Sequence, residues 1–143
     1  MPRISILNFL LGYLFIFLSA SGGFFLSEEF TMAHLQGGDE LHSWWLQIAA
    51  SAHGHTNLFG MLHILLGLTI PYSFKSRKIR VLKTVGLFLG SLAMSFLLYF
   101  RAYQKPTLEY DFIGILIGVC LSGALFSIGL QIFGLILKLR RVE

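Results

Sequence analysis

Residues 112–139 read FIGILIGVCLSGALFSIGLQIFGLILKL, and this stretch decides the class of fold. It contains a single charged side chain, that of Lys138. A helix needs roughly 20 mainly apolar residues to cross the hydrocarbon core of a bilayer, and this run is longer than that. The sequence therefore predicts a membrane-spanning helix over about 112–139.

Three further stretches have the same apolar character, at about residues 4–26, 45–72 and 81–100. Of the 143 residues, 55% are hydrophobic and 13% are charged, whereas a soluble domain usually carries about 25% charged residues. This composition excludes a disordered chain, a coiled coil and an ordinary soluble enzyme. We expect one all-α domain over residues 1–143, an integral membrane four-helix bundle.

The charged residues indicate how such a bundle is oriented. Four spans place both termini and the second loop on one side, and that side holds nine of the 11 Lys and Arg residues: Arg3, Lys75, Arg77, Lys78, Arg80, Lys83, Lys138, Arg140 and Arg141. Six of the seven acidic residues fall on the other side. The positive-inside rule then predicts cytoplasmic N- and C-termini. We expect a multi-pass protein of the bacterial inner (cytoplasmic) membrane, with no nucleic-acid partner.

Small residues recur at helix-packing spacing. Gly86 and Gly90 form a GxxxG pair in the third span, and Gly114, Gly118 and Ser122 continue this pattern in the fourth. Helices in lipid associate through close packing, so such stripes indicate helix–helix contacts. The contacts could lie within a compact bundle, in a homo-oligomer, or between this chain and a larger membrane complex.

All five histidines lie between residues 34 and 63. His34 and His42 fall in the first outer loop, and His53, His55 and His63 fall in the second span. Ionisable groups inside a span are costly, so they favour a functional role. His53 and His55 are about 200° apart around a helix and face opposite sides, while His63 lies about 15 Å further along.

A haem iron takes an axial histidine from one helix, usually with a second ligand from another. The other three spans contain no histidine, so a bis-histidine haem would need a loop histidine or a second subunit. Gly54 leaves room for a planar group beside the backbone. Arg101, at the outer end of the third span, could pair with a haem propionate or snorkel toward the interface.

The run Ala52–Met61 (AHGHTNLFGM) resembles the HxH-containing, haem-binding helix of haem–copper oxidases and nitric oxide reductases. It is still more similar to short four-span proteins described as oxidase subunit I-like. The resemblance implies that His53 and His55 are axial haem ligands. It also matches His55 and Asn57 to the His-Thr-Asn run of a low-spin haem ligand, whereas His63 has no counterpart in the motif.

These observations favour a membrane-embedded protein that binds haem b for electron transfer or gas sensing in a respiratory membrane complex, with a quinone as a candidate partner. An electron carrier or accessory subunit is favoured over a stand-alone enzyme. The candidate cofactor-binding residues are His53, His55, His63, Gly54, Asn57 and Arg101.

Two alternatives stay open. The first is a non-catalytic accessory or assembly subunit, in which the histidines make interhelical hydrogen bonds. The second is a copper or zinc site that faces the periplasm. Its candidate ligands are His53, His55, His34 and His42.

Overall fold

The structure is a computed structural model, and it describes residues 1–38, 43–104 and 111–140. This part of the chain contains helices and no strand, so the predicted all-α class is confirmed. A 3-10 turn follows the second long helix, and a π-helical turn interrupts the third. The elements are α1 (Arg3–Leu35), α2 (Trp44–Thr69), η2 (Ile70–Tyr72), α3 (Arg77–Leu92), η3 (Ala93–Leu97), α4 (Leu98–Ala102) and α5 (Phe112–Leu139).

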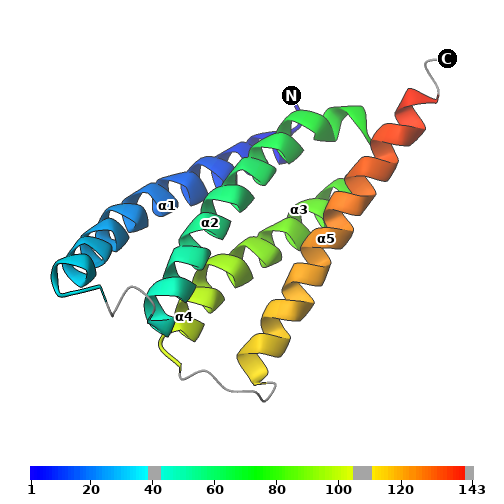
Figure 1. The fold of residues 1–143 in the computed structure, drawn as a ribbon. Helices are drawn as coiled ribbons and strands as arrows, with labels where there is room; N and C mark the ends of the chain where they lie inside the picture. Colours follow the sequence, from blue (N-terminus) through cyan, green and yellow to red (C-terminus); the bar gives the residue numbers. More distant parts are fainter. Residues whose placement is uncertain (39–42, 105–110, 141–143) are drawn as a thin grey trace.

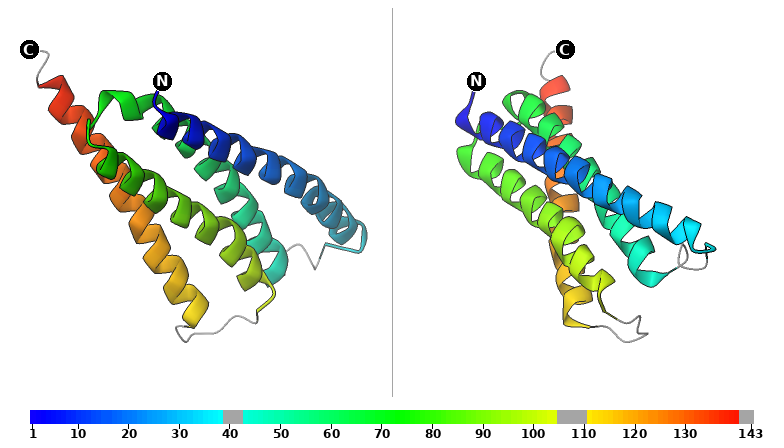
Figure 2. Two further views of the ribbon diagram at one scale, coloured as in Figure 1. Left: turned by 180° about the vertical axis from the view of Figure 1, so that it is seen from behind. Right: turned by 90° about the vertical axis from the view of Figure 1, so that its left-hand side faces the viewer.

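The long helices run alternately up and down, side by side (Figure 1). Helix α1 packs along α2, and α3 packs along α5. Figure 2 shows α1 and α5 at opposite edges of the molecule when it is viewed from behind. The start of α1 and the end of α5 lie at the same end of the molecule, together with the connection between α2 and α3 (Figure 1).

In the described part of the chain, three helices are long and apolar enough to cross a membrane, which is the character of a multi-pass membrane protein. They are α1, the continuous helix Arg77–Ala102 and α5. Helix α2 does not belong to this set, contrary to the expectation of an equally apolar span over 45–72. Its histidines and Asn57 lower its hydropathy. Because α2 packs against α1, α3 and α4, its most polar buried side chains face protein rather than lipid.

The predicted helix boundaries differ most at the first span. Helix α5 covers 112–139 as predicted, but α1 continues past residue 26 to Leu35 and includes Glu28 and Glu29. No glycine or proline interrupts residues 24–35. The helix ends where Gly37 and Gly38 adopt φ values of 111° and 82°, a left-handed conformation that glycine adopts without steric cost.

Glycines allow the closest helix contacts. A methyl group added at Gly12 of α1 would lie 2.7 Å from the carbonyl oxygen of Gly60 in α2. One added at Gly86 of α3 would lie 2.7 Å from the carbonyl oxygen of Gly123 in α5. The packing role predicted for the Gly86–Gly90 pair is therefore confirmed.

The partner surface on α5 differs from the predicted stripe of Gly114, Gly118 and Ser122. Gly118 faces open space and Ser122 is exposed. The α5 residues that meet α3 are instead Gly123, Ala124 and Ser127. The stripe therefore does not form the contact with α3, because spacing identifies a set of small residues on one face but not which face meets the neighbouring helix. Its role in a homo-oligomer or a larger membrane complex stays a prediction.

Candidate functional site on helix α2

His63 lies inside the protein with no exposed surface. Its Nδ1 lies 2.9 Å from Oδ1 of Asn8 on α1, and its Nε2 lies 3.1 Å from the hydroxyl of Ser91 on α3. The ring of Phe15 stacks on the imidazole at a centroid distance of 5.8 Å. Both ring nitrogens are therefore engaged within the fold.

The amide of Asn8 is oriented by two further hydrogen bonds. Its nitrogen donates to the carbonyl oxygen of Ile4 and to the hydroxyl of Thr84, each at 2.8 Å. This leaves Oδ1 to accept a hydrogen bond from His63, so Nδ1 of the imidazole carries hydrogen. Nε2 lies beside the Ser91 hydroxyl, which also donates to the carbonyl oxygen of Leu87 at 2.8 Å. The network joins α1, α2 and α3 with a partner for each of these groups.

His53 faces α1. Its Nδ1 lies 3.3 Å from the hydroxyl of Ser19, and that hydroxyl donates to the backbone carbonyl of His53 at 3.1 Å. The ring lies directly over Gly23, where an added methyl group would lie 2.7 Å from Cε1. The small residues Ser19 and Gly23 of α1 thus provide the space that the His53 ring occupies.

A cavity of about 170 Å³ adjoins His53. The hydroxyl of Ser95, in the π-helical turn, is buried there and has no hydrogen-bond partner in the described part of the chain. The hydroxyl of Tyr99 lies opposite Gly22, where an added methyl group would be 3.6 Å away. The lining residues are Leu18, Ser19, Gly22, His53, Thr56, Ser95, Phe96 and Tyr99.

His55 lies on a different side of α2 from His53, in agreement with their spacing of two residues. Its Nδ1 lies 2.7 Å from the carbonyl oxygen of Ser51. A carbonyl can only accept, so Nδ1 carries the hydrogen and Nε2 of the neutral ring keeps its lone pair. Metal-ligating histidines are oriented in the same way, with the second ring nitrogen donating to a backbone carbonyl or carboxylate.

The space beside His55 is open. Ser51, Gly54, His55 and Leu58 line a shallow hollow of about 270 Å³. No atom of a neighbouring element lies within 4 Å of the position that a side chain at Gly54 would take. A planar group could therefore approach the backbone of α2 at this point.

The structure does not bring His34 close to His53. His34 is exposed near the end of α1, about 22 Å along that helix from Ser19, which contacts His53. His42 lies outside the described residues. Within the described ranges, no group of three or more His, Cys, Asp or Glu side chains could hold a metal ion.

Asn57 and Arg101 are the two remaining cofactor candidates. The side chain of Asn57 is exposed. Arg101 forms an ion pair with Asp111, the N-cap of α5. The pKa of the Asp111 carboxyl lies below its usual range because the backbone N–H of Gly114 and the Arg101 guanidinium both donate to it. Arg101 therefore has an anionic partner within the chain.

A polar cluster at the opposite end was not predicted. Lys83, assigned from sequence to the basic loop side, is fully buried. Its Nζ donates to the hydroxyl of Ser73 at 2.8 Å and to Oε1 of Gln131, and it lies 5.5 Å from the centroid of the Phe74 ring. The one amide in the apolar run 112–139, that of Gln131, was the signal in the sequence.

The sequence matches no protein-family model, and neither a curated protein nor a solved structure matches it.

Proposed function

We propose that this chain is an integral membrane protein that binds a b-type haem through Nε2 of His55 and takes part in electron transfer within a respiratory membrane complex. The observation that carries the proposal is the 2.7 Å contact from Nδ1 of His55 to the Ser51 carbonyl. This contact leaves the second nitrogen free to bind iron and fixes the plane of the imidazole.

The residues around His55 would hold one side of such a group. Gly54 leaves the backbone open beside the imidazole, and Leu58 adds an apolar wall. A haem is larger than this hollow, and the described part of the chain offers no second free histidine facing it. A second protein ligand and the cover for the rest of the haem would come from a second copy or another subunit. The haem would supply one-electron redox chemistry.

A quinone is the electron partner that we propose for this function. The cavity beside His53 has a volume of about 170 Å³, comparable with the roughly 150 Å³ cavity that holds a single benzene ring. The unpartnered hydroxyl of Ser95 could donate to a quinone carbonyl. A quinol mixed with the purified protein should then reduce its haem, and failure to do so would remove the quinone from the proposal.

The test is a reduced-minus-oxidised visible spectrum of the purified protein from cells that make haem. The wild-type chain should show a Soret band that His55→Ala abolishes. His53→Ala is the matched control and should retain the band, since His53 faces α1. A chain without a Soret band, or a band unaffected by His55→Ala, would overturn the proposal. Elemental analysis of the same sample tests for copper or zinc in place of haem.

A non-catalytic accessory subunit is the second candidate. Two of the three α2 histidines have partners on other helices: His63 with Asn8 and Ser91, and His53 with Ser19. If the histidines serve only to form these interhelical hydrogen bonds, the chain should contain no cofactor and should co-purify with partner chains. Assembly would then depend on His63 and be indifferent to His55.

We also infer the orientation of the chain in the bacterial inner membrane, with both termini in the cytoplasm. The beginning of α1, the α2–α3 connection and the end of α5 lie at one end of the molecule (Figure 1). The basic residues gather there, so the positive-inside rule supports this orientation.

A further inference from the structure

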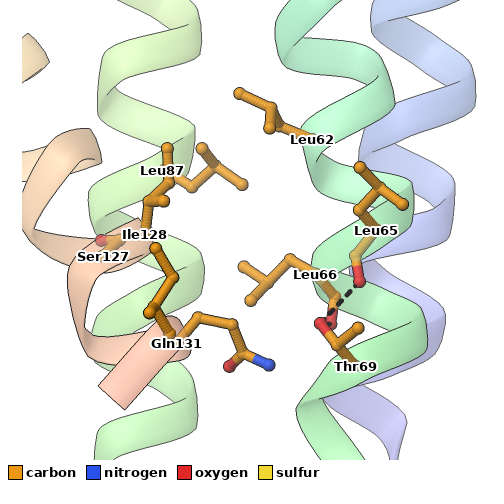
Figure 3. Close-up of a pocket in the computed structure, with 9 residues that line it drawn as sticks. Leu62, Leu65, Leu66, Thr69, Leu87, Ser127, Ile128 and Gln131 are labelled. Atoms are coloured by element: carbon orange, nitrogen blue, oxygen red, sulfur yellow. Dashed lines mark hydrogen bonds between the residues drawn. The ribbon is translucent and has the colours of Figure 1, made fainter. Parts of the chain in front are cut away.

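A groove runs between α2 and α5, with α3 as its floor. Its volume is about 120 Å³, and its walls are mainly leucine and isoleucine side chains (Figure 3). The side chain of Gln131 reaches into this groove from α5 (Figure 3). Gln131 is 8% exposed, and its Nε2 has no hydrogen-bond partner in the described part of the chain. A buried donor without a partner is costly, so the groove favours an occupant that carries an acceptor.

The charge behind Gln131 strengthens this preference. Oε1 of Gln131 accepts from the ammonium group of Lys83, which is fully buried. No carboxylate among the described residues forms an ion pair with that ammonium. Hydrogen bonds in a chain polarise one another, so the bond from Lys83 makes the amide N–H of Gln131 a stronger donor. An acceptor in the groove therefore experiences a positive potential.

A second cavity, of about 310 Å³, lies at the basic end of the molecule. Its wall includes the exposed side chains of Lys75, from the α2–α3 connection, and Lys138, from the end of α5. Ser73 also lines this cavity, and its hydroxyl donates to Oε1 of Gln131 at 3.0 Å. The two cavities thus lie on either side of one hydrogen bond, with cations at one end and an apolar groove at the other.

We propose that the two cavities together bind one anionic glycerophospholipid from the leaflet at the basic end of the molecule. The phosphate lies between Lys75 and Lys138. An ester carbonyl accepts from Nε2 of Gln131, and an acyl chain follows the groove between α2 and α5. Basic pockets between transmembrane helices bind anionic headgroups in this manner.

The spacing along α5 suits this arrangement. Gln131 precedes Lys138 by seven residues, or about 10 Å of helix. One interfacial layer of a bilayer is roughly 5–8 Å thick, so a tilted helix places the lysine among the phosphates when the amide is at the level of the ester groups. The proposal does not depend on haem binding.

The headgroup is tested by native mass spectrometry of the full chain with phosphatidylglycerol and phosphatidylcholine of identical acyl chains. The wild-type protein should retain phosphatidylglycerol preferentially. Each of Lys75→Gln and Lys138→Gln should lower that preference about fivefold, the usual contribution of one cation at a membrane surface. Lys78→Gln removes the same charge from an exposed site outside the cavity and should change nothing. Equal retention of both lipids, or an equal effect of Lys78→Gln, would refute the site.

The contact with Gln131 needs a separate measurement. A diether phosphatidylglycerol has the same headgroup but no ester carbonyl, and the wild-type chain should retain it less well than the diester. Gln131→Leu should abolish this difference. Ile128→Trp fills the groove without removing the partner of Lys83. This variant should retain both the diester and the diether lipid less well than the wild-type chain. A diester preference that survives Gln131→Leu, or full retention by Ile128→Trp, would show that the acyl chain lies elsewhere.

Discussion

The imidazole of His63 is held by polar groups from two other helices, Asn8 on α1 and Ser91 on α3. Such bonds between helices in a membrane contribute about 0.6 kcal/mol on average and at most about 1.7 kcal/mol. Their larger effect is directional, because each polar side chain must meet its partner when the helices pack. His63 therefore fixes the relative rotation of α1, α2 and α3.

Replacing His63 by leucine should destabilise the protein by about 1–3 kcal/mol, because Oδ1 of Asn8 then loses a buried partner. A double-mutant cycle with Asn8→Leu should give a coupling energy of about 0.6–1.7 kcal/mol. Unfolding of the detergent-solubilised protein by dodecyl sulfate measures both. Thr69→Val is the control, since the Thr69 hydroxyl bonds only within its own helix. Strictly additive losses for His63 and Asn8 would contradict this account.

Single residues were predictable in position but not in partnership. The sequence indicates that three histidines fall within one helix and that His53 and His55 point apart. It does not indicate that His63 bonds to Asn8, 55 positions away, or that Lys83 bonds to Gln131, 48 positions away. Those pairings arise from the rotation of whole helices, which no local pattern encodes. Nε2 of His55 is free because the side-chain rotamer directs Nδ1 to the Ser51 carbonyl, and the sequence does not indicate that rotamer.

The α1–α2 and α3–α5 helix pairs approach most closely at glycines, where backbone atoms of the two helices meet. At the α1–α2 crossing, Gly12 and Gly60 face each other, and an added methyl group at Gly12 would also lie 2.6 Å from Cγ1 of Ile64. Close approach of this kind brings many atoms into van der Waals contact, which is the main source of helix association in lipid.

Gly12→Ala should therefore destabilise the protein by about 1–3 kcal/mol, the usual cost of overpacking. Gly118→Ala is the matched control. Its position faces open space, and the higher helix propensity of alanine should leave stability unchanged or raised by up to about 1 kcal/mol. Thermal unfolding in one detergent compares the two variants. Equal stability of both would show that the crossing tolerates a methyl group.

Hydropathy predicted whole elements better than their ends. Helix α5 agrees with the prediction because its apolar run starts directly after Asp111, whose carboxylate caps the helix by accepting from the N–H of Gly114 at 2.6 Å. Helix α1 continues beyond its apolar run, to Leu35, because a helix does not have to end where hydropathy falls. Helix α2 was predicted as a span of ordinary apolarity, although burial between other helices lets it carry polar side chains.

At the scale of the whole molecule, the up-and-down arrangement brings both ends of the described chain and the α2–α3 connection together (Figure 1). The residues at that end include Arg3, Lys75 and Lys138, whereas Glu28 and Asp111 lie toward the other end. This separation of charge supports one orientation across a membrane over its inverse.

Cysteine labelling in intact cells tests the orientation. In a Cys120→Ser background, Gln36→Cys should react with a membrane-impermeant maleimide, and Ser76→Cys should react only after the cells are lysed. Both positions are exposed, so burial does not limit the reaction. The reverse pattern would place the basic end outside, and labelling of both positions in intact cells would contradict a spanning topology.

The π-helical turn η3 has a consequence for the helix that contains it. Such a turn inserts one residue into an α-helix, and one residue corresponds to about 100° of rotation. The periodicity of Arg77–Leu92 is therefore out of phase with that of Leu98–Ala102. The first segment packs on α5 and the second on α2, so one continuous rod meets two neighbours in different directions. A hydrophobic-periodicity calculation that treats residues 77–102 as one regular helix therefore averages two different buried faces and identifies neither.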